Sequence, residues 1–210
     1  MLAIFKREFK SYFQNVIGWL FVAALLAVYG LYFYVYNLKN GYPYISYDLK
    51  GIGFIMMIAV PILTMRSLSD EKKTKTDQLM LTSPVSVGRI VAGKYLAMAA
   101  VYTIDIALFA LSPLVLSIYG KVALSEAYVA LFGYWLYGLS CIAVGLFISS
   151  ISESVIISAI LTFAALFISY MMQSITGLIS SSGNLLTKVL NCFDLYTPFE
   201  NFVSGCFSVT

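Results

Sequence analysis

The sequence predicts an all-α membrane protein, a polytopic bundle of helices whose N-terminus lies in the cytoplasm. Hydrophobic residues make up 60% of the 210 positions and charged residues only 11%, whereas about 25% of a soluble domain is usually charged. Several uncharged stretches are long enough to cross a bilayer as helices, which takes about 20 apolar residues. These stretches are continuously apolar, whereas a membrane β-barrel needs segments of roughly ten residues with alternating polarity.

Residues 1–15 are expected to form an amphipathic helix at the membrane interface. Their sequence places one group of residues on an apolar face (Leu2, Phe5, Phe9, Tyr12, Phe13) and a second on a basic face (Lys6, Arg7, Lys10). The apolar run that follows is longer than the 7–15-residue core of a signal peptide and lacks a small-residue cleavage site. We therefore interpret it as a retained first span.

Five spans are expected within residues 16–175, at 16–38, 51–65, 92–119, 127–148 and 155–175. The second is short, so either Lys50 extends its side chain to the interface or the helix begins before it. Pro61 removes a backbone donor near the end of this span and is expected to kink it. Tyrosines near the end of the first span are typical of an aromatic belt at a membrane interface.

Residues 176–210 are rich in Ser, Gly, Thr and Asn and do not predict a sixth span. With the spans alternating, nine Lys and Arg lie on the side of the N-terminus and four on the other. The positive-inside rule therefore places the N-terminus and the 66–94 loop in the cytoplasm, and 176–210 outside. Cys192 and Cys206 share this outer segment; two unpaired thiols are the simpler interpretation and a disulfide the alternative.

The 66–94 loop holds six of the thirteen Lys and Arg residues and three of the ten acids. Within it, Thr74-Lys75-Thr76-Asp77 matches a helix-start signal and Ser83-Pro84 a stop, which predicts about two helical turns. Three successive residues of this helix, 79–81, are apolar, and each large apolar side chain gains about 1.5–3 kcal/mol on burial. Either a soluble partner or the membrane interface is expected to cover them.

The run PILTMRSLSDEKKTKTDQLMLTSPVSVGRIVAGKYLA resembles type-2 ATP-binding-cassette permeases, particularly the branch of gliding-motility and copper-maturation permeases. The shared pattern is a helix end with proline and arginine, two acids, a Thr-acid-x-Leu-Leu-Leu-Thr-Ser-Pro-like segment and a Gly-Lys start of the next span. It matches Pro61, Arg66, Asp70, Glu71, Thr76, Asp77, Leu79, Met80, Leu81, Thr82, Ser83, Pro84, Gly93 and Lys94. A second run, GLFISSISESVIISAILTF, resembles the family's turn between the fourth and fifth spans.

The resemblance implies a permease subunit of an exporter that forms half of a translocation pathway. A coupling helix would dock into a groove of a separate ATPase subunit through Thr76, Asp77, Gln78, Leu79, Met80, Leu81, Thr82, Ser83 and Pro84. Residues 1–15 would be the elbow helix, and a second permease subunit, identical or related, would complete the dimer. The implied location is the plasma (inner) membrane of a bacterium or archaeon, with several passes. Because these permeases have six spans, the chain is expected to be truncated before a sixth, and 176–210 would be the outer re-entrant segment.

No catalytic, metal or cofactor site is expected in this chain. It has no His and no Cys-x-x-Cys pair, and its net charge of +3 is too small to indicate nucleic-acid binding. Residues 88–95 nearly match the phosphate-binding loop GxxxxGK[ST], but Tyr95 stands where a hydroxyl should reach magnesium and no strand precedes. ATP and Mg are therefore expected in the partner ATPase.

Asp105 is the one charge placed well inside a predicted span. A carboxylate in lipid costs at least about 2.5 kcal/mol, so a pathway or helix-pairing role is one interpretation. A structural hydrogen bond to Thr103, Tyr102 or a serine of a neighbouring helix is the other. Two further function classes stay open at this point: an intramembrane enzyme, with Asp105 as its single intramembrane acid, and a scaffold that binds a partner through the same loop.

Overall fold

The computed structural model describes residues 2–76, 86–119, 122–179 and 194–203, and within these ranges every regular element is helical. Among these residues, five segments are long and apolar enough to cross a membrane: Val16–Lys39, Ser46–Lys73, Val87–Tyr119, Leu124–Ile151 and Val155–Met172. The predicted polytopic helical bundle with five spans is confirmed. Asp77 to Pro84 of the predicted coupling helix, and both Cys192 and Cys206, lie outside the described residues.

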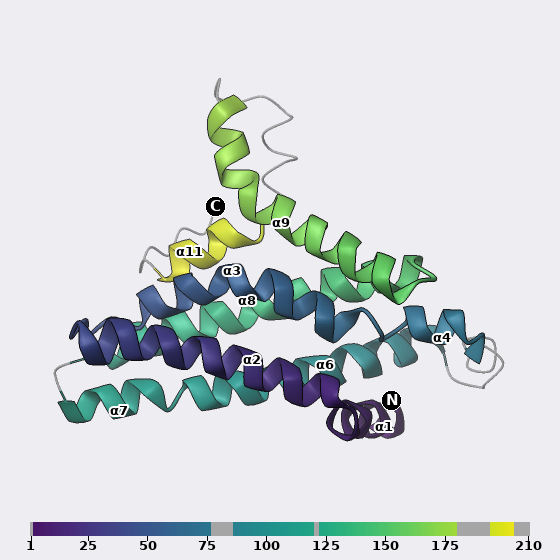
Figure 1. The fold of residues 1–210 in the computed structure, drawn as a ribbon, viewed down its shortest axis with the longest axis horizontal. Helices are drawn as coiled ribbons and strands as arrows, with labels where there is room; N and C mark the ends of the chain where they lie inside the picture. The colour runs from purple at the N-terminus through teal and green to yellow at the C-terminus, as the bar shows by residue number, and fades with distance from the viewer. Residues whose placement is uncertain (1, 77–85, 120–121, 180–193, 204–210) are drawn as a thin grey trace.

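Helix α1 (Leu2–Gln14) lies across one end of the bundle, and its axis runs across that of α2 (Val16–Phe33) (Figure 1). Phe5, Phe9 and Phe13 form a ladder of ring contacts along one face of α1. The two helices meet closely at Gly18, where a Cβ would lie 2.5 Å from the Tyr12 carbonyl oxygen. The amphipathic segment therefore turns directly into the first span without a loop.

The second span begins earlier than its uncharged run suggests. α2 continues as a π-helix, η1 (Tyr34–Lys39), and α3 runs from Ser46 to Thr64, passing through Pro61. Asp48 is buried and accepts a hydrogen bond from the Asn37 side chain, and Lys50 pairs with Glu200 at 3.2 Å. Of the two alternatives for Lys50, the structure selects the earlier helix start, because these partners support charged residues inside the first turns.

The third span is divided. α6 (Val87–Phe109) ends shortly before Pro113, and α7 (Ser112–Tyr119) continues the crossing. Proline cannot donate a backbone hydrogen bond and disfavours helical geometry at the residue before it, which accounts for the break. The Ser112 hydroxyl donates to the Phe109 carbonyl oxygen at 2.7 Å across the junction.

The remaining described helices are α8 (Leu124–Ile151), α9 (Val155–Ile179) and α11 (Tyr196–Val203). α3 is central and packs against α2, α8, α9 and α11. The 176–210 segment begins with the last turn of α9, and its short helix α11 lies over α3 and α8 in Figure 1. Figure 1 also shows α1 and α4 (Ser69–Lys73) at one end of the bundle, which we call the junction end.

Aromatic residues fill the core between α6 and α8. Tyr102 is fully buried and donates a hydrogen bond to the Tyr134 carbonyl oxygen at 2.7 Å. Its ring occupies the space left by Gly138, where a Cβ would lie 2.3 Å from the Tyr102 Cζ. This contact brings α6 and α8 close together, as expected for a small residue at a membrane helix interface.

Candidate functional site

The second span leaves the bundle at the junction end and leads into the short helix α4. Helix α4 ends at Lys73 and is followed by the C-cap residue Thr74, whose hydroxyl donates to the Asp70 carbonyl oxygen at 2.8 Å. Lys75 then adopts a positive φ of 55°, an uncommon conformation for a non-glycine residue that turns the chain away from the helix axis. Thr76, the one predicted docking residue within the described ranges, is exposed and donates from its hydroxyl to the Glu71 carbonyl oxygen at 3.3 Å.

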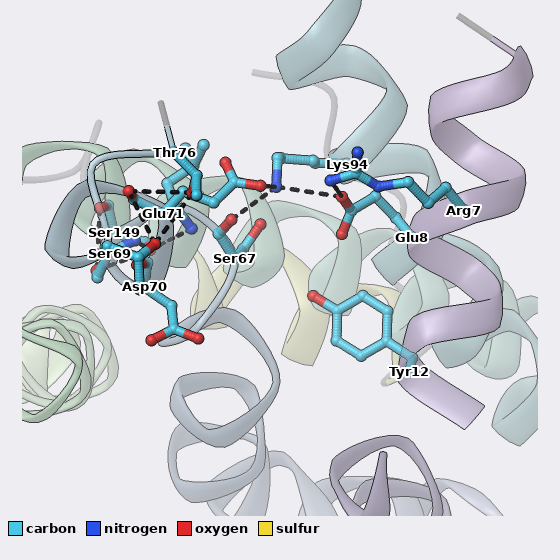
Figure 2. Close-up of polar contacts among 12 residues, drawn as sticks. Arg7, Glu8, Tyr12, Ser67, Ser69, Asp70, Glu71, Thr76, Lys94 and Ser149 are labelled. Carbon is cyan, nitrogen blue, oxygen red and sulfur yellow. Dashed lines mark hydrogen bonds and ion pairs between the residues drawn. The ribbon is translucent and has the colours of Figure 1, made fainter. Parts of the chain in front are cut away.

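Lys94, on the first turns of α6, is the centre of a buried ionic cluster. Its side chain is only 2% exposed. Its Nζ lies 2.6 Å from Glu71 Oε1, 3.4 Å from Glu8 Oε1 and 2.8 Å from the Ser67 carbonyl oxygen, to which it donates (Figure 2). One ammonium group thus joins α1, the end of the second span, α4 and α6.

A second set of hydrogen bonds ties the same segment to the end of α8. The backbone N–H groups of Leu68 and Ser69 both donate to Ser149 Oγ at 3.2 Å, and Ser69 Oγ donates to the Ser149 carbonyl oxygen at 3.1 Å. Lys72 Nζ donates to the Ser150 carbonyl oxygen. Ser69 and Ser149 are both fully buried, so these bonds are shielded from water.

We refer to these contacts, made by Glu8, Ser67, Ser69, Glu71, Lys94 and Ser149, as the polar junction. In Figure 2 the six residues form a nearly continuous row between α1 and the end of α8. Tyr12 lies beside the row and donates from its phenol to the Leu63 carbonyl oxygen at 3.3 Å. Burial, and next the negative charge of Glu8, raise the pKa of Tyr12 above its ordinary value of 10, so the phenol stays neutral.

The energetics of the polar junction favour a rigid unit. Removing one partner of a buried ion pair typically costs about 3–5 kcal/mol, because the other charge is left unpaired in a poorly solvated site. Lys94 cannot leave Glu71 and Glu8 without such a cost.

Asp105 occupies a different part of the molecule, in the membrane portion of α6. It is fully buried, and neither carboxylate oxygen has a hydrogen-bond partner among the residues that the structure describes. The expected structural bonds are not formed there: Tyr102 donates to Tyr134, and Thr103 donates to the Ala99 carbonyl oxygen at 2.7 Å. The structure thus places Asp105 far along α6 from Lys94 and does not bring the two together.

Glu8, Ser67, Ser69 and Ser149 were not predicted from the sequence. Glu8 carried a usable signal, since it is an acid within the basic face of α1, between Arg7 and Lys10. Lys94 also carried one, because a lysine at the start of an apolar span requires a partner or water. The three serines carried none, because their role depends on which helix ends meet.

Comparison with known proteins gives one family. A family model described as ABC-2 family transporter protein matches residues 31–207. None of the curated proteins that were compared matches the chain. The match covers the last part of the first span and all four others, and the membrane subunit of such a transporter works with an ATPase partner and is not itself the catalytic component. The chain therefore belongs to the ABC-2 family of transporter proteins, as a multi-pass permease subunit of an ABC transporter.

Proposed function

We propose that this permease is an exporter subunit in which the polar junction passes movement of the ATPase to the ends of the membrane helices. The ATPase docks on the segment from Thr76 to Pro84, and that segment follows α4 directly in the chain. The observation that carries the proposal is the position of Lys94. It joins α4 to α1 and α6 through one buried charge.

Two routes lead from the docking segment into the bundle. The first runs through Glu71 and Lys94 into α6 and α1. The second runs through Ser69 to Ser149 at the end of α8. Because both begin on the five-residue helix α4, a displacement of that helix moves three other helices in concert.

Export, pairing with a second permease subunit and assignment to the gliding-motility and copper-maturation branch rest on the resemblance of residues 61–97 to that branch. In this proposal the second subunit, identical or related, supplies the other half of the pathway. ATP and Mg bind to the ATPase pair.

Asp105 is proposed as a pathway residue. A carboxyl group without a hydrogen-bond partner destabilises the protein when it lies in an apolar environment. A conformation in which Asp105 contacts water or a partner group avoids this cost and is therefore favoured. A change of helix arrangement during transport supplies such a conformation. Asp105 would then line the pathway in one state and be buried in the state described here.

The docking claim is tested by co-expressing the chain with the ATP-binding-cassette ATPase encoded beside it and recovering the complex from detergent. Leu79→Asp places a charge on the docking segment and should abolish recovery of the ATPase while the permease still inserts. Leu79→Met, which keeps an apolar side chain of similar volume, is the matched control and should retain it. Equal recovery with all three chains would refute docking at this segment and favour a scaffold that binds its partner elsewhere.

A further inference from the structure

We propose that the cavity between α1 and the exit of the second span binds the headgroup of a phospholipid that carries a primary ammonium, as in phosphatidylethanolamine. The cavity has a volume of about 370 Å³, within the range of sites that bind small molecules. Six of its lining residues are charged: Arg7, Glu8, Arg66, Asp70, Glu71 and Lys94. This inference is independent of where the ATPase docks.

The cavity lies where lipid headgroups are expected. On one side it is lined by Gln14, Asn15 and Ile17, at the turn from α1 into the first span. Immediately beyond, Val16, Trp19 and Leu20 expose 52–77% of their surface and require a hydrocarbon environment. The Trp19 indole N–H donates to the Phe13 carbonyl oxygen at 2.9 Å, an arrangement suited to the boundary between acyl chains and headgroups. A lipid whose chains cover these apolar residues has its headgroup level with the cavity.

The six charges differ in how firmly they are held. Lys94 and Glu71 are 2% and 17% exposed and form the closest pair, at 2.6 Å. Arg66 and Asp70 are 49% and 41% exposed and lie 3.4 Å apart, and Arg7, 68% exposed, lies 3.6 Å from Glu8. The Arg66–Asp70 pair is exposed on both sides, and a pair of this kind contributes little and can exchange partners. The two arginines and Asp70 are therefore the groups that are accessible to a ligand.

These accessible groups select the chemistry of the headgroup. Arginine binds phosphate oxygens with two parallel N–H donors, so Arg7 and Arg66 suit the phosphodiester. Asp70 offers carboxylate acceptors to an ammonium, which donates three hydrogen bonds when primary and none when trimethylated. With three positive and three negative residues, the site is balanced and favours a zwitterion over an anionic lipid.

The buried Ser67 hydroxyl supports a polar ligand at this place. Ser67 lines the cavity, is 6% exposed, and its Oγ has no hydrogen-bond partner of normal geometry among the described residues, although the Tyr12 phenol approaches it. Buried hydroxyl groups are usually hydrogen-bonded. A headgroup oxygen in the cavity would satisfy it.

The test is native mass spectrometry of the full chain in detergent, with phosphatidylethanolamine, phosphatidylcholine and phosphatidylglycerol of identical acyl chains at equal concentration. Phosphatidylethanolamine should bind about tenfold more tightly than the other two, the loss expected for missing charge-assisted hydrogen bonds. Arg66→Gln should weaken its binding by about the same factor. Asp70→Asn should remove the preference for phosphatidylethanolamine over phosphatidylcholine.

Arg89→Gln is the matched control, because Arg89 is exposed at the same end of the bundle, on α6, and does not line the cavity. It should bind as the wild type does, and all variants should elute as the wild type does in gel filtration. Equal binding of the three lipids, or stronger binding of phosphatidylglycerol, would overturn the proposal. So would displacement of the lipid by equimolar O-phosphoethanolamine, because the ligand would then be a soluble phosphate compound.

Discussion

The Lys94 side chain is almost completely buried. Only 2% exposed, it contacts Glu71, Glu8 and the Ser67 carbonyl oxygen. Replacing it leaves the part-buried carboxylates of Glu8 and Glu71 without the cation that they share, so the energetic cost falls on these two acids.

Lys94→Met should therefore destabilise the folded protein by about 3–5 kcal/mol, seen as a lower midpoint of thermal unfolding in detergent. The matched variant is Lys94→Met combined with Glu8→Gln and Glu71→Gln, in which no unpaired charge is left. That triple variant should recover most of the loss. If the single and triple variants unfolded at the same temperature, the ionic cluster would not be the cause.

Ser149 is an uncharged residue of the polar junction that also contributes to the free energy of unfolding. It accepts hydrogen bonds from two backbone N–H groups at the start of α4. Ser149→Ala leaves both donors unsatisfied and should cost about 1–3 kcal/mol in unfolding free energy. Ser150→Ala is the control, since the Ser150 hydroxyl donates only within its own helix, to the Phe147 carbonyl oxygen. Equal effects of the two substitutions would show that the hydrogen bonds accepted by the Ser149 hydroxyl contribute no stability.

At the scale of elements, helix packing in the membrane portion depends on the fit of Tyr102 against Gly138. Gly138→Ala would place a methyl group 2.3 Å from the tyrosine ring and force α6 and α8 apart. Overpacking of this kind costs about 1–3 kcal/mol, so its thermal unfolding midpoint should fall.

Gly30→Ala provides the comparison within the same measurement. Gly30 lies on an exposed face of α2 with no atom within 4 Å of its added Cβ. Its substitution should leave the midpoint unchanged or raise it, because alanine is the better helix former. Equal destabilisation by both substitutions would show that the Tyr102 contact is not the cause of the loss at Gly138.

The elements were predictable to the extent that apolar runs define them. All five spans could be read from the sequence, because each long uncharged run leaves a helix as its only stable form in a bilayer. The start of α3 at Ser46 could not, because Asp48 and Lys50 are tolerated only through Asn37 and Glu200. Such partners come from other elements and leave no local pattern.

At the scale of the whole molecule, the contacts of the polar junction likewise could not be predicted from local sequence patterns. Glu8, Glu71 and Lys94 lie far apart in sequence, and only the alternation of spans across the membrane brings their segments to one end of the bundle. The sequence supported a shared side for residues 1–15 and 66–94. It gave no means of choosing which charges would meet.

The central claim at this scale is that the polar junction moves as one body when the ATPase closes. Spin labels on Lys73→Cys and Arg89→Cys, both at exposed positions, report the separation of α4 and α6 in a background that lacks the three native cysteines. Labels on Lys73→Cys and Lys10→Cys report the separation of α4 and α1. A label pair on the two ATPase copies shows that closure has occurred.

The most direct measurement is the Lys73–Lys10 and Lys73–Arg89 label distances by pulsed electron resonance, in the assembled transporter with and without ATP. The account predicts that both distances stay constant while the distance between the ATPase labels shortens. A change in the Lys73–Arg89 distance on ATPase closure would show that α4 hinges away from α6, which would contradict transmission through Lys94.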